Sequence, residues 1–222
     1  AITALFLIAR GGSAFAEQSV DLELIIGVDV SRSVDSYEAK LQRDGYVTAF
    51  SDHRVIEAIK SGFLGKIAVL YFEWAGYGHQ KVVADWTVIE DEASAKAFAA
   101  KVAREPYESA RRTAISEAID WAVPQFESNR FKSRRRVIDI SGDGPNSWGR
   151  RVDAARDDAV AAGITINGLP IIDADSADSS RWWLPNLDLY YEHCVIGGRG
   201  AFVIVANGFM DFANAVRRKL VL

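Results

Sequence analysis

Residues 22–33 read LELIIGVDVSRS, and the two halves of this segment differ in character. The first part, Leu22–Asp29, is a nearly continuous apolar run, as expected of a β-strand that is buried on both faces. The second part, DVSRS, places a carboxylate and two hydroxyl groups directly after that strand. Strands buried on both faces belong to parallel sheets covered by helices, so the segment indicates an α/β protein with polar residues at a strand end.

Strand and helix patterns alternate along the rest of the chain. Further strands are predicted at 66–74, 81–88 (an edge strand or hairpin partner), 136–141, 165–169 (ended by Pro170) and 201–205. Helices are predicted at 34–50 (with Ser33 as N-cap), 55–59, 92–104, 113–126 (broken late by Pro124), 148–162 and 208–220. This order predicts a doubly wound, mostly parallel central sheet flanked by helices, a Rossmann-type three-layer sandwich. Such sheets place ligand sites beyond the carboxyl ends of their strands.

Composition excludes several classes of protein. The 222 residues suit one domain, and the net charge of −4 argues against a strongly basic nucleic-acid binder. A single cysteine, Cys194, cannot form an internal disulfide, and three histidines make a His/Cys zinc site improbable. The sequence contains no nucleotide-binding glycine motif and no Gly-x-Ser-x-Gly nucleophile motif. A metal bound by this chain would therefore need oxygen ligands.

Residues 1–16 have the pattern of a signal peptide remnant. They begin with AITALFLIA, and Ala14 and Ala16 match the A-x-A pattern that signal peptidase cuts. We expect the mature chain to start at Glu17, to form a single domain over 17–222 and to be exported to the periplasm or secreted. No stable membrane insertion is expected after cleavage. The alternative is a buried N-terminal helix.

Polar groups follow two strands and precede one helix at the same predicted edge of the sheet. They are Asp29, Ser31 and Ser33 after the first strand, Thr113 at the start of a helix, and Asp143 after the fourth strand. Two carboxylates and three hydroxyls are oxygen ligands of the kind that Mg²⁺ prefers, with Mn²⁺ and Ca²⁺ as alternatives. The alternative for the first motif alone is a strand end followed by a helix cap.

This combination resembles a von Willebrand factor A (VWA) domain, and the resemblance covers about Val20–Leu220. It implies a VWA-like fold in which the five residues form a metal-ion-dependent adhesion site. The segments IIGVDVSRSVD, RTAISEAID and DISGDGPN are also similar to a secreted bacterial group called domain of unknown function 1194. That group implies no activity. In one departure, Ser141 and Gly142 precede Asp143, where VWA domains more often have Thr.

Arginines surround the predicted metal ligands. Arg32, Arg111, Arg112 and Arg150 could form a positive collar that attracts an acidic partner, and Trp148 could anchor the interface. The alternatives are solvated surface charge for the arginines and loop packing for the tryptophan.

Two further features are left with two interpretations each. Glu73 could accept a hydrogen bond from a metal-bound water or pair with an arginine. Trp182 and Trp183 are either interface anchors or loop packing.

The sequence favours a metal-dependent protein-binding module, for adhesion or interaction, over an enzyme. The cation would bridge the domain to a carboxylate of a protein partner, and the domain is expected to be monomeric. One alternative is a magnesium-dependent hydrolase or phosphatase with Asp29 as nucleophile, although such enzymes resemble Asp-x-Asp where this chain has Ser31. The other is an exported scaffold with an unoccupied site.

Overall fold

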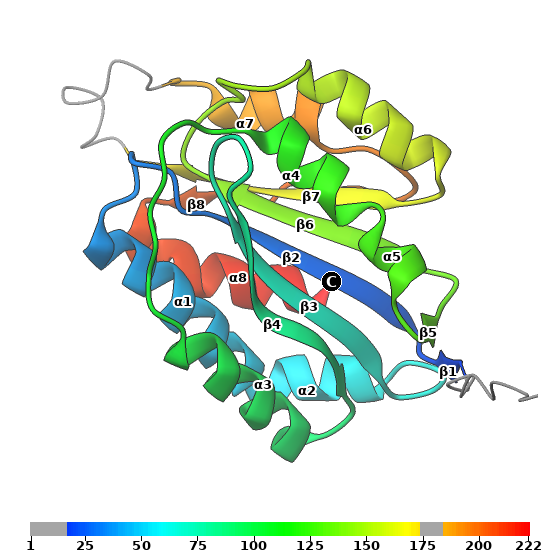
Figure 1. Cartoon of the computed structure of the whole chain (residues 1–222). Coiled ribbons are helices and arrows are strands. Elements are labelled where there is room, and N and C mark those ends of the chain that lie inside the picture. Colours follow the sequence, from blue (N-terminus) through cyan, green and yellow to red (C-terminus); the bar gives the residue numbers. More distant parts are fainter. Residues whose placement is uncertain (1–16, 174–183) are drawn as a thin grey trace, which may run out of the picture.

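The central feature of the domain is a six-stranded sheet with the strand order β4-β3-β2-β6-β7-β8 (Figure 1). The computed structural model describes residues 17–173 and 184–222. Neighbouring strands are parallel except β3 and β4, which are antiparallel. The strands are β2 (Leu22–Asp29), β3 (Ile67–Trp74), β4 (Gln80–Ile89), β6 (Arg136–Gly142), β7 (Thr165–Ile172) and β8 (Ala206–Asn207). The predicted doubly wound, mostly parallel sheet is confirmed.

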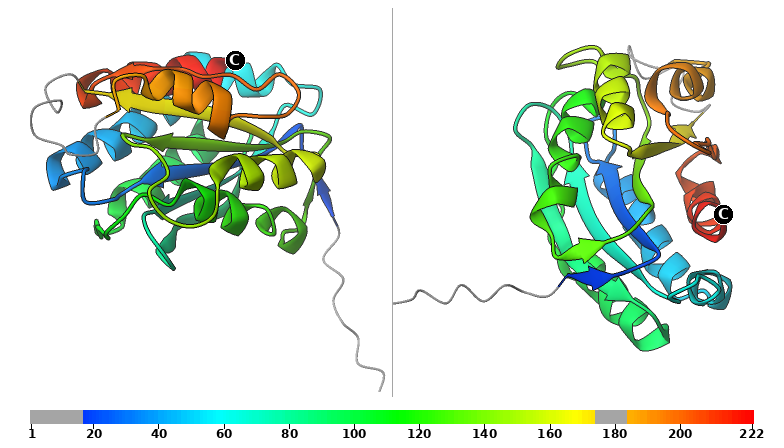
Figure 2. Two further views of the ribbon diagram at one scale, coloured as in Figure 1. Left: turned by 90° about the horizontal axis from the view of Figure 1, so that it is seen from above. Right: turned by 90° about the vertical axis from the view of Figure 1, so that its right-hand side faces the viewer.

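Helices cover both faces of the sheet, as Figures 1 and 2 show. One face packs against α1 (Ser36–Phe50), α2 (His53–Lys60), α3 (Glu92–Arg104) and α8 (Phe212–Val221). The other packs against α4 (Ile115–Ala122), α5 (Gln125–Ser128), α6 (Val152–Ala161), α7 (Leu187–Tyr190) and a π-helix (Tyr191–Val195). A short parallel pair, β1 (Gln18–Ser19) and β5 (Phe131–Lys132), lies outside the main sheet. Within the described residues, no helix is both long and apolar enough to span a membrane.

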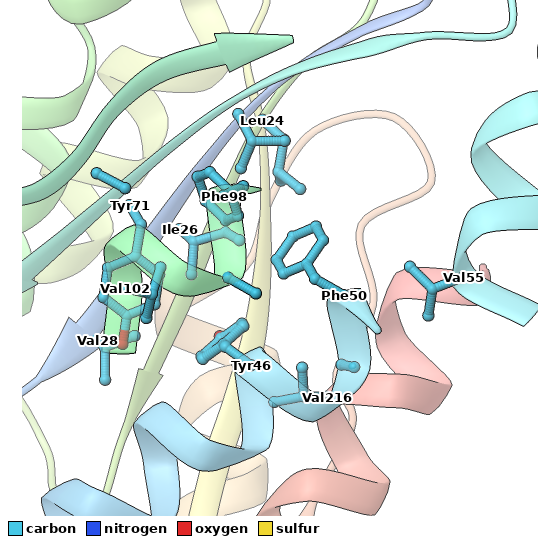
Figure 3. Packing of buried hydrophobic residues seen from close by; sticks show 14 of the residues in the cluster. Leu24, Ile26, Val28, Tyr46, Phe50, Val55, Tyr71, Phe98, Val102 and Val216 are labelled. Atoms are coloured by element: carbon cyan, nitrogen blue, oxygen red, sulfur yellow. The ribbon is translucent and has the colours of Figure 1, made fainter. Parts of the chain in front are cut away.

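The run at Leu22–Asp29 is buried from its second residue onward because it lies in the middle of the sheet. Figure 3 shows Leu24, Ile26 and Val28 of β2 facing Tyr46 and Phe50 of α1. Burying each such side chain contributes about 1.5–3 kcal/mol. This packing holds β2 in place, so that its last residue, Asp29, lies at the carboxyl edge of the sheet.

The first helix begins later than predicted, and Ser33 is not its N-cap. Asp35 caps α1 instead, accepting hydrogen bonds from the backbone N–H groups of Tyr37 (2.7 Å) and Glu38 (2.8 Å). Glu38 in turn accepts from the Asp35 N–H at 2.8 Å, which completes a capping box. Ser33 is therefore left outside the helix, and its hydroxyl points to other partners.

The predicted end of β7 at Pro170 is wrong. The strand runs on to Ile172, with Pro170 paired to Gly142 of β6. A proline has no N–H to donate. Because backbone groups alternate along a strand, the Pro170 nitrogen faces the same side of β7 as the Gly168 nitrogen, whose N–H donates to the Phe202 carbonyl. Regular pairing with β8 on that side begins only at Ile171. The missing N–H of Pro170 therefore removes no hydrogen bond from the regular pairing of β7 with β8.

Several other helices and strands begin or end at residues that differ from the predicted ones. The helix predicted at 113–126 begins only at Ile115, and its predicted break at Pro124 is confirmed as the division between α4 and α5. The helix predicted at 148–162 begins only at Val152. The strand predicted at 201–205 makes one bridge at Val203 before β8 begins. The helix predicted at 208–220 starts as a 3₁₀ turn, Phe209–Asp211, ahead of α8. The π-helix and the β1–β5 pair were not predicted.

Candidate metal site

The carboxyl edge of the sheet brings the five predicted ligands together. Asp29 ends β2, and Asp143 follows β6, the strand next to it. Ser31 and Ser33 lie in the loop between β2 and α1, and Thr113 lies just before α4. The Thr113 segment is tied to this edge because the Ala110 N–H donates to the Val30 carbonyl and the Ala114 N–H to the Ala75 carbonyl.

The hydroxyls and the Asp143 carboxylate form a connected set of oxygens. Ser33 Oγ donates to Asp143 Oδ1 at 2.8 Å and lies 3.1 Å from Ser31 Oγ. Thr113 Oγ1 donates to Ser31 Oγ at 3.4 Å. Adjacent oxygens around an octahedral Mg²⁺ are about 3.0 Å apart, because each lies about 2.1 Å from the ion. The spacing of these four side chains therefore fits neighbouring positions around one small cation.

Asp29 is fully buried, and its carboxylate is only partly satisfied. Its Oδ1 accepts the Ser31 N–H at 2.7 Å, while Oδ2 is buried without a hydrogen-bond partner in the described structure. Burial and the nearby charge of Asp143 raise the pKa of Asp29 well above its usual value. Burial also raises the pKa of Asp143. Two neighbouring carboxylates that resist ionisation are a fitting environment for a divalent cation, which would compensate both charges.

The surroundings of Asp29 explain why a glycine precedes Asp143. A Cβ at Gly142 would lie 2.9 Å from Asp29 Oδ2 and 3.0 Å from the Tyr191 hydroxyl oxygen. Both atoms are buried and without hydrogen-bond partners in the described residues. The pKa of Tyr191 is raised by burial and by the charge of Asp29. Gly142 thus keeps a small polar space beside the unpartnered carboxylate oxygen.

A buried network behind the ligands holds their loops. Gln42 of α1 donates to the Asp29 carbonyl at 3.1 Å. Arg43 donates two hydrogen bonds, of 2.6 and 2.8 Å, to Glu73 at the end of β3, so the open interpretation of Glu73 resolves to an arginine pair. Arg43 also donates to the carbonyls of Glu105 and Pro106. It thereby anchors the segment that leads to Thr113.

All five predicted partner residues are exposed, and four of them lie on loops next to the ligands. Arg32 lies between Ser31 and Ser33, and Arg111 and Arg112 directly precede Thr113. The Arg112 guanidinium lies 5.4 Å from the ring centre of Trp148, which is 46% exposed. Arg112 has a left-handed backbone with φ of 77°, unusual for a residue with a side chain. Arg112 adopts this conformation in the loop that places its guanidinium against the Trp148 ring.

The fifth, Arg150, is engaged within the domain. Its guanidinium donates to Asp120 of α4 at 2.9 and 2.6 Å and to Asp158 of α6 at 2.6 Å. Two carboxylates therefore neutralise its charge. Trp182, Trp183 and the predicted signal peptide, residues 1–16, lie outside the described residues.

Sequence reasoning did not identify Gln42, Arg43 or Tyr191 as parts of this site. Nothing in their local sequence distinguishes them from core residues, because their role depends on packing between distant segments. Within residues 17–173 and 184–222, no group of three or more His, Cys, Asp and Glu side chains could hold a metal. The set described here is of another kind, with hydroxyl ligands supplementing two carboxylates.

A family model described as "Protein of unknown function (DUF1194)" matches residues 19–222. No curated protein matches the chain by sequence.

Several solved structures are similar in fold. Proximal thread matrix protein 1 from the mussel byssus, with a zinc-occupied MIDAS motif, is 12% identical with a TM-score of 0.61, covering 92% of this chain and 48% of its own. A von Willebrand factor type A protein from Catenulispora acidiphila is 17% identical (TM-score 0.59; 91% of this chain, 42% of its own). The SpRpn10 VWA domain is 12% identical (TM-score 0.57; 88% of this chain, 94% of its own). The chain spans about half the length of the mussel protein. These likenesses show a VWA-like fold.

Proposed function

The chain belongs to the DUF1194 family of proteins of unknown function, and from its site we propose that it is a metal-dependent protein-binding domain. A divalent cation, Mg²⁺ by the chemistry of the ligands, bridges Asp29, Ser31, Ser33, Thr113 and Asp143 to a carboxylate of a protein partner. The structurally similar mussel protein has a zinc-occupied MIDAS motif, which supports a cation site in a domain of this fold.

One observation carries the proposal. Four side chains supply oxygens spaced 2.8–3.4 Å apart, beside a buried Asp29 oxygen that has no partner among the described residues. A buried carboxylate oxygen without a partner, such as Asp29 Oδ2, costs free energy unless a further group satisfies it. A cation at this edge would satisfy the carboxylates and the hydroxyl lone pairs together.

The ligand set also indicates how a partner would bind. Three of the five ligands are neutral hydroxyls, so the two carboxylates balance a divalent cation without giving the site excess negative charge. When bound, the cation supplies a Lewis-acidic centre that an incoming carboxylate can complete. Arg32, Arg111 and Arg112 add positive charge around the site, which favours the approach of an acidic group. Trp148 offers an apolar contact beside it.

The phosphatase alternative is less well supported. Asp29 would be its nucleophile, yet this carboxyl group is 0% exposed and Oδ1 is bound by the Ser31 N–H. A nucleophile must reach the reacting atom, which buried Asp29 oxygens are poorly placed to do. We therefore propose binding rather than catalysis. Phosphatase turnover that requires Mg²⁺ and is lost in Asp29→Asn would reverse this preference.

Export, to the periplasm or beyond the cell, and a monomeric state remain parts of the proposal. They rest on the A-x-A pattern of residues 14–16 and on a domain whose ligands come from one chain. The acidic balance of the sequence gives no support to a nucleic-acid partner.

The test uses a peptide array in which each acidic peptide has an amide twin, Asp against Asn and Glu against Gln. The full chain should bind acidic members in Mg²⁺, lose them in chelator and ignore the amide twins. Asp143→Asn, which keeps the side-chain shape, should not bind. Equal binding in chelator, or equal binding of amide twins, would refute the bridging mechanism.

A further inference from the structure

A cavity of about 260 Å³ lies at the amino end of the sheet, opposite the metal site. It is enclosed by the first residues of β2, β3 and β6 and by the helices α2 and α8. Most of its lining side chains are apolar, and three of them, Leu24, Phe50 and Val55, are labelled in Figure 3. The exposed residues Ser61 and Arg135 also line it, so the cavity is open to solvent. Since a cavity of about 150 Å³ holds benzene, this one has room for a small molecule with an apolar body.

Three buried polar side chains interrupt the apolar wall of this cavity. They are Asp139 of β6, Asn167 of β7 and Lys219 of α8, each at least nine-tenths buried. Asp139 and Asn167 are directly paired in the sheet, and Asn167 Nδ2 donates to Asp139 Oδ1 at 3.0 Å. Lys219 Nζ lies 3.4 Å from the same carboxylate oxygen. The three residues therefore form one polar corner in an otherwise apolar cavity.

One donor and one acceptor of this polar corner are unsatisfied. Lys219 Nζ is buried and makes no hydrogen bond within the described structure, although an ammonium group has three N–H donors. Both contacts of the Asp139 carboxylate involve Oδ1, which leaves Oδ2 without a hydrogen bond among the described residues. Unpaired polar groups in apolar surroundings cost free energy. A bound group that accepts from Lys219 and donates to Asp139 would remove this cost.

The formal charges that line the cavity balance one another. Asp21 and Asp139 supply two carboxylates, and Arg135 and Lys219 supply two cations. A charged ligand would therefore bring an uncompensated charge into apolar surroundings, which is costly. A hydroxyl group carries no charge, and it can accept one hydrogen bond while it donates another. The polar corner thus suits an alcohol better than a carboxylate or an amine.

We propose that this cavity binds an uncharged amphiphile, an alcohol with an alkyl chain and roughly ten non-hydrogen atoms in all. The hydroxyl oxygen accepts from Lys219 Nζ, and the O–H donates to Asp139 Oδ2. The alkyl chain lies against the apolar lining. A water molecule would satisfy the same two groups but would leave the apolar walls wet, so an alkyl chain that displaces water adds affinity. Binding in this cavity does not depend on a cation at the other end of the sheet.

The test is isothermal titration of the full chain with three probes of similar size. They are n-octanol, its isomer heptyl methyl ether, which has no O–H group, and octanoate. The wild type should bind n-octanol saturably. The ether should bind about tenfold more weakly, because it cannot donate to the Asp139 carboxylate. Octanoate should also bind at least about tenfold more weakly, because its charge is uncompensated.

Two substitutions place the binding in the cavity. Ala58 of α2 lines the cavity and is half-buried, so Ala58→Phe should abolish n-octanol binding by filling the space. Ala100→Phe is the matched control, because Ala100 is a half-buried alanine of α3 that lies outside the cavity lining. This variant should bind n-octanol as the wild type does.

A double variant tests the polar corner. Lys219→Met with Asp139→Asn removes both charges together, so no unpaired buried charge remains. Its preference for n-octanol over the ether should fall to at most about threefold. An unchanged preference in this variant would overturn the proposal. So would absence of n-octanol binding by the wild type, equal wild-type binding of the ether or of octanoate, or retained binding by Ala58→Phe.

Discussion

The Ser33 hydroxyl donates a 2.8 Å hydrogen bond to the Asp143 carboxylate, joining two loops whose residues are 110 positions apart in the sequence. The contact exists because β2 and β6 are adjacent parallel strands that end at the same edge. Ser33 is available for it because Asp35 caps α1. One local cap and one strand pairing thus bring together two of the five proposed ligands.

Asp143→Asn should separate metal binding from folding. The variant removes one of two interacting carboxylates but keeps an oxygen that can accept from Ser33. In chelator its melting temperature should equal or exceed that of the wild type, because the repulsion with Asp29 is gone. Wild type in Mg²⁺ at a hundred times its Kd should gain about 2.7 kcal/mol, and the variant nothing. Thermal unfolding with and without Mg²⁺ measures both effects; a full Mg²⁺ gain in the variant would exclude Asp143 as a ligand.

Gly142→Ala should weaken metal binding by crowding Asp29. The new methyl group would lie 2.9 Å from Asp29 Oδ2, so the carboxylate must shift. We expect Mg²⁺ affinity to fall at least about tenfold and the free energy of unfolding to fall by about 1–3 kcal/mol. Gly144→Ala is the matched control, because its nearest neighbour, Thr113 Oγ1, would be 4.0 Å away. Equal affinities of the two variants would contradict this account of the site.

Arg43→Met should destabilise the fold and loosen the Thr113 segment. The substitution leaves Glu73 buried without its partner, which costs about 3–5 kcal/mol. Adding Glu73→Gln should recover much of this loss, because no buried charge then remains. Mg²⁺ affinity should stay reduced in the double variant, since the carbonyls of Glu105 and Pro106 have lost their donor. Denaturant titrations and metal titrations of both variants test the two effects separately; wild-type affinity in the double variant would show that Arg43 does not position Thr113.

Lys219 gives the stability of the fold a distinctive pH dependence. It is buried in α8, with Nζ 3.4 Å from Asp139 Oδ1, and burial lowers its pKa below 10.5. In the pH range between the lowered pKa and 10.5, the unfolded chain binds more protons than the folded one, so raising the pH stabilises the fold. The contribution is complete above 10.5 and is lost as the pH falls through the lowered pKa.

The check compares wild type with Lys219→Met in denaturant titrations at several pH values. At neutral pH the variant should be less stable, because Asp139 loses its cationic neighbour. The advantage of the wild type should increase from neutral pH towards 10.5, the usual pKa of lysine. A difference that stays constant with pH would show that the pKa of Lys219 is not lowered by folding.

The sequence was most informative where local pattern and tertiary environment agree. Leu22–Asp29 could be predicted to the residue because a central strand is apolar on both faces. The meeting of the five proposed ligands could be predicted because each follows a strand or opens a helix at the same edge. Asp35 and Glu38 have the spacing of a capping box, so the N-cap of α1 is also readable from the sequence, two residues after Ser33.

Other parts depend on contacts that no local pattern reveals. Arg43 looks like an ordinary helix residue until α1 packs beside Glu73. Tyr191, in a π-helix distant in sequence, lies across Gly142 from Asp29. The sequence predicts Arg150 as part of a positive collar, but in the fold its guanidinium donates hydrogen bonds to Asp120 and Asp158. Each of these results from the packing of segments that are distant in sequence.

Isothermal titration of the full chain with Mg²⁺ tests the central claim most directly. Wild type, Asp29→Ala and Asp44→Ala are compared, the last removing an exposed carboxylate of α1 that lies outside the site. We predict saturable binding by the wild type and by Asp44→Ala, and none by Asp29→Ala. Binding by Asp29→Ala equal to that of the wild type, or no binding by any of the three, would contradict a metal site at this edge of the sheet.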